Sequence, residues 1–133
     1  MDNISILGII IAALVFFLLG GAWYTFLFGK DWRSEMGITE EQAKGASPNP
    51  MMFVWSILVA LVIATTLAKL IGESTTTYGF KIGAGVGVGI GAAILAQNYV
   101  YEQRSFKFWL INAGYLIFGL AAMGLIIGWF QAA

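Results

Sequence analysis

The stretch that decides the fold is residues 3–29, NISILGIIIAALVFFLLGGAWYTFLFG, which contains no charged side chain. Charge-free stretches also cover residues 45–68, 82–101 and 108–133. Each is long enough to cross a lipid bilayer as a helix, because about 20 apolar residues are needed to span the hydrocarbon layer. We therefore predict an all-α integral membrane protein, a four-helix bundle with antiparallel, up-down transmembrane helices.

The helix limits follow from local signals at the ends of these stretches. Asn49 precedes Pro50, and an Asn N-cap followed by proline at the first helical position is a typical helix start. Ser105 is the corresponding N-cap of the last helix. All helices belong to one predicted transmembrane domain, residues 1–133, and they cover about residues 4–28, 50–72, 78–101 and 106–130.

Composition excludes several classes of protein. Hydrophobic residues make up 59% of the chain and charged residues 11%, and the net charge of zero argues against nucleic-acid binding. The chain has no histidine and no cysteine, which excludes disulfides, thiolate nucleophiles, Cys/His zinc sites and His-ligated haem. The acids near the membrane, Asp31, Glu35 and Glu102, therefore lack a catalytic partner. We expect no enzyme, no cofactor and no metal site.

Two segments outside the long apolar stretches carry local signals: the N-terminus and the longest connection, residues 29–49. Met1-Asp2-Asn3 has no basic residue, so we expect a retained first helix rather than a cleaved signal. In the connection at residues 29–49, Thr39-Glu40-Glu41-Gln42 fits a capping box, and Gly45 and Pro48 are expected to stop the helix that it starts within about two turns. Trp32 and Met36 are spaced four apart, which predicts a short amphipathic helix on the membrane surface.

Orientation follows from the placement of basic residues. The basic residues form two groups, which are expected on opposite sides of the membrane. The first and third connections hold Lys30, Arg33, Lys44, Arg104 and Lys107, whereas the other side holds Lys69 and Lys81. We expect the first and third connections to be cytoplasmic and both termini to lie outside.

A run of alternating glycines marks the third stretch. A strand is excluded because its edges would be unpaired in lipid, and a phosphate loop is excluded because neither G-x-G-x-x-G nor a following Lys-Ser/Thr is present. On a helix, the run forms two rows of small residues on different sides, which predicts a helix sandwiched between partners. The glycines predicted to pack helices are Gly83, Gly85, Gly87, Gly89, Gly91, Gly124 and Gly128. We expect a homo-oligomer, most simply a dimer; the alternative is that all of these glycines pack within one chain.

Aromatic and amide side chains gather at one end of the predicted bundle. The candidate ligand- or partner-binding residues there are Trp23, Tyr24, Trp55, Asn98, Tyr101, Trp109, Asn112 and Tyr115. One interpretation is an aromatic belt at the lipid head groups with amides bonded between helices. Asn98 and Asn112 would then need buried partners, either each other or Tyr24. The other interpretation is a pocket open to the cytoplasm for a small amphipathic or lipid-like ligand.

Two motifs carry a resemblance to a known family. The residues Gly20-Gly21-Ala22-Trp23-Tyr24 and Leu27-Phe28-Gly29-Lys30-Asp31-Trp32 resemble the signature of the small bacterial membrane proteins catalogued as domain of unknown function 1761. The stretches Met36 to Glu41, Arg104-Ser105-Phe106 and Leu110 to Tyr115 are similar to its other recurrent segments. The resemblance implies a four-helix protein of the bacterial inner membrane and supplies no activity. The glycine run is denser than we expect of the family.

Three functional hypotheses remain open. The first is a non-enzymatic, homo-oligomeric membrane protein that binds a lipid-like molecule or a partner at the aromatic and amide cluster. The second is a small channel or transporter with a pore at the oligomer axis, lined by the third helix and Asn98. No carboxylate or histidine lies at mid-membrane, which argues against proton-coupled transport. The third is an accessory subunit of a membrane complex.

Overall fold

The computed structural model describes residues 4–45 and 49–132. Four helices within these residues are long and apolar enough to cross a membrane, and no strand is present among them, which confirms the all-α prediction. Each begins and ends within two residues of the predicted limits. The elements in chain order are α1 (Ile6–Ala22), η1 (Trp23–Leu27), α2 (Gly29–Met36), α3 (Glu40–Gly45), α4 (Pro50–Ile71), α5 (Thr76–Val86), η2 (Gly87–Ala92), α6 (Ala93–Glu102) and α7 (Phe106–Phe130). The η segments are π-helical and continue the spans Ile6–Leu27 and Thr76–Glu102.

Each long helix begins at a side-chain N-cap. The predicted caps are confirmed, because Asn49 Oδ1 accepts from the Met51 N–H and Ser105 Oγ accepts from the Phe108 N–H, both at 3.0 Å. Ser5 and Thr75 cap α1 and α5 in the same way. These caps satisfy backbone donors that have no partner within their own helix.

The predicted capping box in the first connection is also confirmed. The Thr39 N–H donates to Gln42 Oε1 at 2.9 Å, and the Gln42 N–H donates back to Thr39 Oγ1 at 3.1 Å. This box starts α3, while Trp32 lies on the preceding helix α2. Of the two predicted stops, Gly45 is the last residue of α3, and Pro48 lies outside the described residues.

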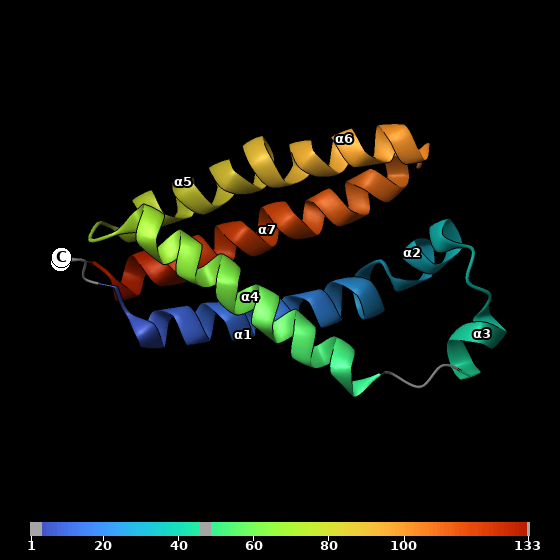
Figure 1. Ribbon diagram of the computed structural model, residues 1–133, viewed down its shortest axis with the longest axis horizontal. Coiled ribbons are helices and arrows are strands. Elements are labelled where there is room, and N and C mark those ends of the chain that lie inside the picture. Colours follow the sequence, from blue (N-terminus) through green and yellow to red (C-terminus); the bar gives the residue numbers. More distant parts are fainter. Residues whose placement is uncertain (1–3, 46–48, 133) are drawn as a thin grey trace.

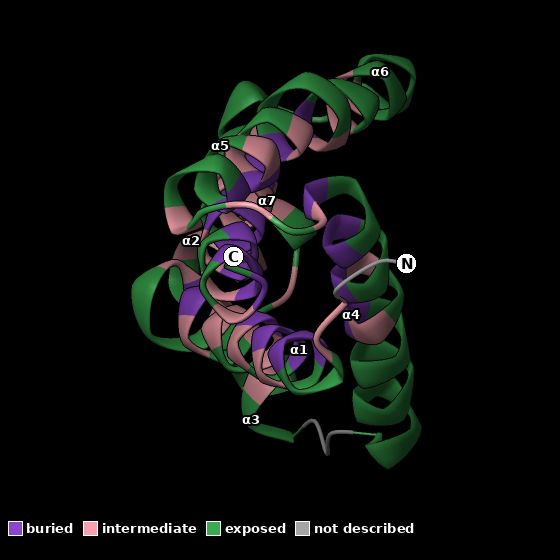
Figure 2. Ribbon diagram, turned by 90° about the vertical axis from the view of Figure 1, so that its left-hand side faces the viewer, coloured by how far each residue is buried: buried purple, intermediate pink, exposed green. Residues whose placement is uncertain are grey.

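The central helix of the bundle is α7, which packs against α1, α4 and α5 (Figures 1 and 2). Half of the residues in the most apolar part of α7 are buried, compared with a third or less in the other three membrane-length helices. The main core joins α1, α7 and the C-terminal half of α4, and it consists of Ile9, Ala12, Ala13, Phe16, Ala60, Ala64, Leu67, Ala68, Ile71, Leu120, Met123 and Ile127. The core therefore lies in the half of the bundle that contains Ser5 and Gln131, away from the first connection.

Glycines allow α5 and η2 to lie directly against α7. A methyl group added at Gly83 would overlap the Leu120 carbonyl oxygen, and one at Gly79 would overlap the Gly124 carbonyl oxygen. At Gly87 the added carbon would lie 3.0 Å from the Ile117 Cα atom. Residue numbers rise along one helix as they fall along the other, so these two helices run in opposite directions. Such close approach increases van der Waals contact, which is the main packing force in lipid.

The second row, Gly85 and Gly89, meets no other helix among the described residues. A methyl group at Gly85 or Gly89 would have no atom of the described residues within 4 Å. The predicted sandwich around this helix is therefore occupied on one side only. Gly124 and Gly128 contact α5 and the residues just before it, because their backbone lies against Thr75 and Gly79.

A buried glutamine joins three helix ends. The Gln131 side chain is 2% exposed, and its Nε2 donates to the carbonyl oxygens of Ala68 at 3.0 Å and Gly72 at 2.9 Å. Its Oε1 accepts from the Ser5 N–H at 3.1 Å. The Gln131 backbone oxygen also accepts from the Ser74 N–H at 3.2 Å. This residue therefore ties the start of α1 and the end of α4 to the end of α7.

Candidate ligand-binding groove

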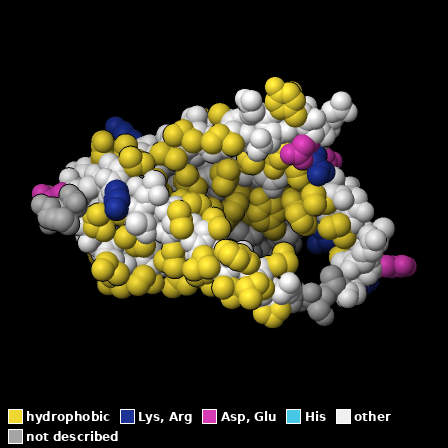
Figure 3. Space-filling view, in the orientation of Figure 1, with side chains coloured by type: hydrophobic (Ala, Val, Ile, Leu, Met, Phe, Trp, Pro, Cys, Tyr) yellow, Lys and Arg dark blue, Asp and Glu magenta, His cyan; other side chains and the backbone are white. Residues whose placement is uncertain are grey.

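The two halves of α4 have different surroundings. Its C-terminal half enters the core, whereas every residue from Pro50 to Val59 is exposed. In Figure 1 this N-terminal half diverges from α6 and α7. The space-filling view shows a hollow lined by hydrophobic side chains between them (Figure 3). We call this hollow the groove.

The larger cavity of the groove has a volume of about 840 Å³. One wall comes from α1 and η1, and the opposite wall comes from the exposed half of α4. Its lining residues are Phe16, Phe17, Leu18, Gly20, Gly21, Ala22, Tyr24, Thr25, Phe26, Phe53, Trp55, Ser56, Val59 and Tyr115. The cavity is therefore mostly apolar and aromatic, which is typical of sites for hydrophobic ligands.

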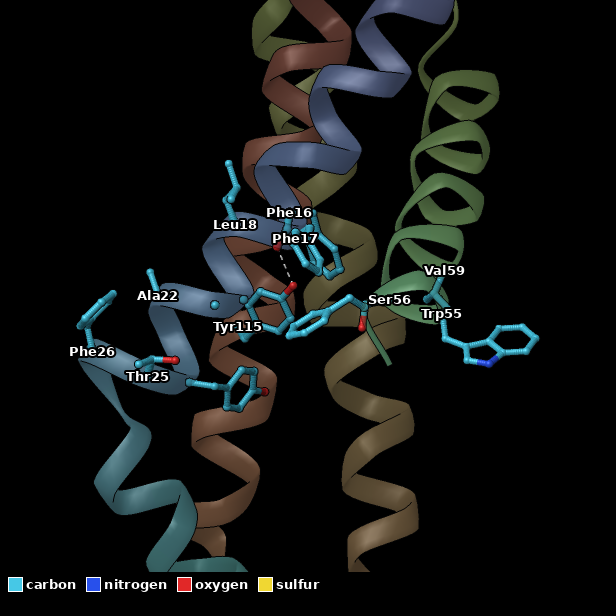
Figure 4. A pocket seen from close by; sticks show the side chains of 14 residues that line it. Phe16, Phe17, Leu18, Ala22, Thr25, Phe26, Trp55, Ser56, Val59 and Tyr115 are labelled. Carbon is cyan, nitrogen blue, oxygen red and sulfur yellow. Dashed lines mark hydrogen bonds between the residues drawn. The ribbon is translucent and has the colours of Figure 1, made fainter. Parts of the chain in front are cut away.

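Aromatic side chains set the shape of this cavity. The Phe17 and Phe53 rings meet edge to face across α1 and α4, with centroids 6.0 Å apart. In the close-up, Ser56 lies on the side of α4 that faces Tyr115, whereas Trp55 extends away from α1 (Figure 4). The Ser56 hydroxyl donates to the Met52 carbonyl oxygen at 2.8 Å, so its own helix satisfies it.

Two further aromatic side chains are fixed to backbone carbonyls beside the cavity. Tyr115 Oη donates to the Phe16 carbonyl oxygen at 2.7 Å, and Trp23 Nε1 donates to the Ile111 carbonyl oxygen at 2.9 Å. Glycines make room for both. A Cβ atom at Gly20 would lie 2.7 Å from Tyr115 Oη, and one at Gly114 would lie 2.9 Å from Trp23 Cζ2.

A chain of polar groups crosses the floor of the groove. Tyr24 Oη donates to Asn112 Oδ1 at 2.6 Å, and Asn112 Nδ2 donates to Tyr99 Oη at 3.0 Å. The Tyr24 and Tyr115 rings pack edge to face at 5.4 Å. These contacts join η1, α6 and α7, and they place hydroxyl and amide groups at the edge of an apolar cavity.

A second cavity of about 690 Å³ shares two lining residues with the larger one. Tyr24 and Tyr115 line both cavities. Its lining residues are Tyr24, Trp32, Met36, Leu95, Tyr99, Glu102, Arg104, Phe108, Asn112, Tyr115 and Leu116. Two of these, Glu102 and Arg104, are exposed and charged, so this cavity has a polar mouth.

Helix α2 is held beside the second cavity by polar contacts to the start of α7. Lys107 Nζ pairs with Asp31 Oδ1 at 2.9 Å, and Ser105 Oγ donates to Glu35 Oε1. Trp32 packs edge to face on Tyr24 with ring centroids 5.7 Å apart. The predicted amphipathic pair Trp32 and Met36 thus lines a cavity, which sequence spacing alone did not indicate.

The structure separates the predicted binding residues into two sets. Trp23, Tyr24, Asn112 and Tyr115 lie together, and Trp55 lines the larger cavity from α4. The other three predicted binding residues lie apart from this set; they are Asn98, Tyr101 and Trp109.

Asn98 and Tyr101 are exposed on α6, so the expectation of a buried partner for Asn98 is wrong. That expectation assumed that Asn98 faces the bundle. Of the two alternatives for Asn112, the one with Tyr24 is found. Trp109 Nε1 donates to the Ala92 carbonyl oxygen at 2.9 Å, outside both cavities.

Sequence reasoning did not select the phenylalanines of the larger cavity, Phe16, Phe17 and Phe53, because phenylalanine is common throughout the apolar stretches. Tyr99 was also left out of the predicted binding residues. Tyr99 and Asn112 lie on two different helices, α6 and α7, so helical periodicity does not indicate that they are neighbours. Among residues 4–45 and 49–132, no group of three or more Asp, Glu, His and Cys is placed to hold a metal ion.

Membrane-length helices around a lateral groove define a multi-pass α-helical membrane protein. Residues 7–128 match the family described as "Protein of unknown function (DUF1761)", and the chain belongs to this family. The resemblance seen in the sequence is thereby confirmed. No curated protein and no solved structure matches the chain.

Proposed function

We propose that this chain is a non-enzymatic integral membrane protein that binds a lipid-like molecule in the groove. The observation that carries the proposal is the apolar cavity of about 840 Å³ beside the exposed half of α4. A cavity walled by a diverging transmembrane helix opens sideways, toward the acyl chains of the bilayer. Its aromatic walls suit hydrocarbon, and the polar floor at Tyr24 and Asn112 suits the polar end of an amphipathic molecule.

Photo-crosslinking tests this proposal directly. Purified protein is mixed with a phospholipid that carries a diazirine on its acyl chain, irradiated, and mapped by peptide mass spectrometry. We expect labelling to concentrate on Phe17, Phe53 and Tyr115. Equal labelling of these residues and of Phe118, which is exposed on α7, would contradict a binding site.

A filling variant supplies the control for this experiment. Ser56→Trp places an indole inside the larger cavity and is expected to reduce the specific labelling at least several-fold. Leu58→Trp adds an indole on the same helix, where the side chain lines a different surface with Val62 and Thr65. It is expected to leave the labelling unchanged. Equal loss in both variants would argue for a general disturbance of α4 rather than a site.

The open row of glycines supports a homo-oligomer, most simply a dimer. Gly85 and Gly89 leave a flat surface on the outside of the bundle, where the backbone of a second copy has room to approach. Mass measurement of the protein in detergent tests this assembly. A monomer at all concentrations would contradict it.

A small channel or transporter at such an oligomer axis is the second candidate function. The observation in its favour is the exposed Asn98 amide on a membrane-spanning helix, because lipid offers it no hydrogen bond. Flux of ions and small solutes into proteoliposomes measures this activity. Saturable flux that Asn98→Leu abolishes would favour the channel over the lipid-binding protein.

We place the protein in the bacterial inner membrane, with the first and third connections cytoplasmic and both termini outside. The distribution of lysine and arginine supports this orientation, since basic residues are retained on the cytoplasmic side. The chain has no cysteine, so single cysteines introduced at Lys44 and Thr77 report on opposite sides without background. An impermeant thiol reagent applied to intact cells should label only the second position.

A further inference from the structure

The second cavity carries one positive and one negative side chain at its mouth. Arg104 Nε lies 3.5 Å from Glu102 Oε1, and both residues line the cavity. The Arg104 guanidinium also lies over the Phe108 ring, with its Cζ atom 4.9 Å from the ring centroid. These contacts hold the guanidinium in place through its Nε side and its face. Its terminal N–H groups are the ones suited to bidentate binding of a phosphate.

Neutral donors lie deeper in the same cavity. Tyr99 Oη accepts a hydrogen bond from Asn112 Nδ2, which leaves the Tyr99 O–H proton to donate to another group. Asn112 Nδ2 carries a second hydrogen as well. Phosphate and ester oxygens accept such hydrogen bonds. The cavity therefore offers one charged donor, Arg104, at its mouth and neutral donors, Tyr99 and Asn112, farther inside.

The charge balance around this cavity favours a zwitterion over an anion. Beside the cavity Lys107 pairs with Asp31, and the nearby Glu35 adds a negative charge, which disfavours a purely anionic ligand. Arg104 and Glu102 are the charged residues that line the cavity, and their charges sum to zero. They contact each other through Nε and Oε1, which leaves the terminal guanidinium N–H groups and Glu102 Oε2 for a ligand. A ligand with one phosphate and one ammonium group matches both of them. Trp32 also lines this cavity, and ammonium groups bind aromatic faces and carboxylates.

We propose that the groove binds a phospholipid with a zwitterionic head group, a phosphate followed by a primary ammonium, and that this head group lies in the second cavity. Arg104 binds the phosphate, Glu102 binds the ammonium, and Tyr99 and Asn112 donate to the oxygens nearer the acyl chains. The chains pass Tyr24 and Tyr115 into the larger cavity, because these two residues line both. The proposal rests on the proposed function, and it adds the class of ligand and its orientation.

Competition among lipids with identical acyl chains tests the head-group assignment. Detergent-purified protein is titrated with phosphatidylethanolamine, phosphatidylcholine, phosphatidylglycerol and diacylglycerol, and bound lipid is counted by native mass spectrometry. We expect phosphatidylethanolamine to bind about tenfold more tightly than the other three, since it alone fills both charged positions with hydrogen bonds. Equal binding of all four, or tighter binding of phosphatidylglycerol, would overturn the proposal.

Charge-removing variants assign the two roles. Glu102→Gln is expected to remove the preference for the ethanolamine head over the choline and glycerol heads. Arg104→Gln is expected to weaken all three phospholipids and leave diacylglycerol unchanged. Both side chains are exposed, so the variants should fold, which a thermal unfolding scan in detergent verifies. Lys81→Gln, exposed in the middle of α5 and outside both cavities, is the matched control and should change nothing.

These outcomes separate the two proposals. If no lipid binds specifically and Ser56→Trp has no effect, the lipid-binding function itself fails. If diacylglycerol and every phospholipid bind equally, and Ser56→Trp abolishes all binding, the groove binds lipid but the zwitterionic head-group assignment is wrong. A preference that persists in both Glu102→Gln and Arg104→Gln also overturns the assignment.

Discussion

Tyr24 and Asn112 lie 88 positions apart in the chain, and the Tyr24 hydroxyl donates to the Asn112 side-chain oxygen over 2.6 Å. This bond joins the π-helical end of the first span to the first half of the last one. Asn112 in turn donates to Tyr99 on the third span. One amide therefore connects three membrane-spanning helices at the floor of the groove.

Removal of either partner of this bond should destabilise the bundle. Tyr24→Phe and Asn112→Leu are each expected to lower the free energy of unfolding in detergent by about 0.6–2 kcal/mol, the range for hydrogen bonds between transmembrane helices. The double variant should cost less than the sum, because both remove one shared bond. Tyr101→Phe, on an exposed tyrosine, is the control. Additive effects would show that the two groups are not coupled.

The two glycine rows should differ in their sensitivity to alanine. Gly83→Ala places a methyl group onto the Leu120 carbonyl oxygen, so α5 must move away from α7, at an expected cost of about 1–3 kcal/mol. Gly85→Ala has nothing within 4 Å and should leave monomer stability unchanged within about 0.5 kcal/mol. Unfolding in detergent measures both. A similar loss in both variants would contradict the one-sided packing.

The adjacent glycines of the first motif form a second matched pair. Gly20→Ala brings a Cβ atom within 2.7 Å of Tyr115 Oη and should break the bond from Tyr115 to the Phe16 carbonyl oxygen. Gly21→Ala meets no atom within 4 Å. Gly21 also lines the larger cavity, but its added methyl group would not displace Tyr115, so we expect the larger loss of lipid labelling for Gly20→Ala. Unchanged labelling in both variants would mean that the position of Tyr115 does not affect binding.

Gln131 should stabilise the end of the bundle that lies away from the groove. Gln131→Ala removes the bonds to the Gly72 carbonyl oxygen and to the Ser5 N–H, whereas the Ala68 carbonyl oxygen still accepts from the Gly72 N–H; the expected loss of stability is about 1–3 kcal/mol. Gln97→Ala, on an exposed glutamine, should be neutral. Hydrogen exchange at the start of α1 provides a local measure, and it should accelerate only in the first variant. Slow exchange in Gln131→Ala would show that other contacts hold this end.

The membrane spans could be predicted because their signals are local. Absence of charge sets the length of each helix, and short polar side chains such as Asn49 and Ser105 mark where helices start. The capping box at Thr39 is equally local, since both of its hydrogen bonds connect residues three positions apart. Signals of this kind need no knowledge of the neighbouring helices.

The arrangement of the site could not be predicted, because it depends on which side of each helix faces its neighbour. Periodicity gave no such information in a helix that is apolar all round, so Asn98 and Asn112 looked equivalent in the sequence. Only packing distinguishes them, with Asn112 bonded to Tyr24 and Asn98 exposed. The role of Gln131 was hidden for a related reason, because its partners lie far away in the chain.

The contact between Ser5 and Gln131 also has a consequence for the order of events during synthesis. The two residues are 126 positions apart, so their bond can form only after all four membrane-length helices of the described chain have been made. Until then the start of α1 and the end of α4 lack the side chain that ties them together. Gln131 is thus synthesised after the helices that it joins, and this end of the bundle lacks its hydrogen bonds while those helices enter the membrane.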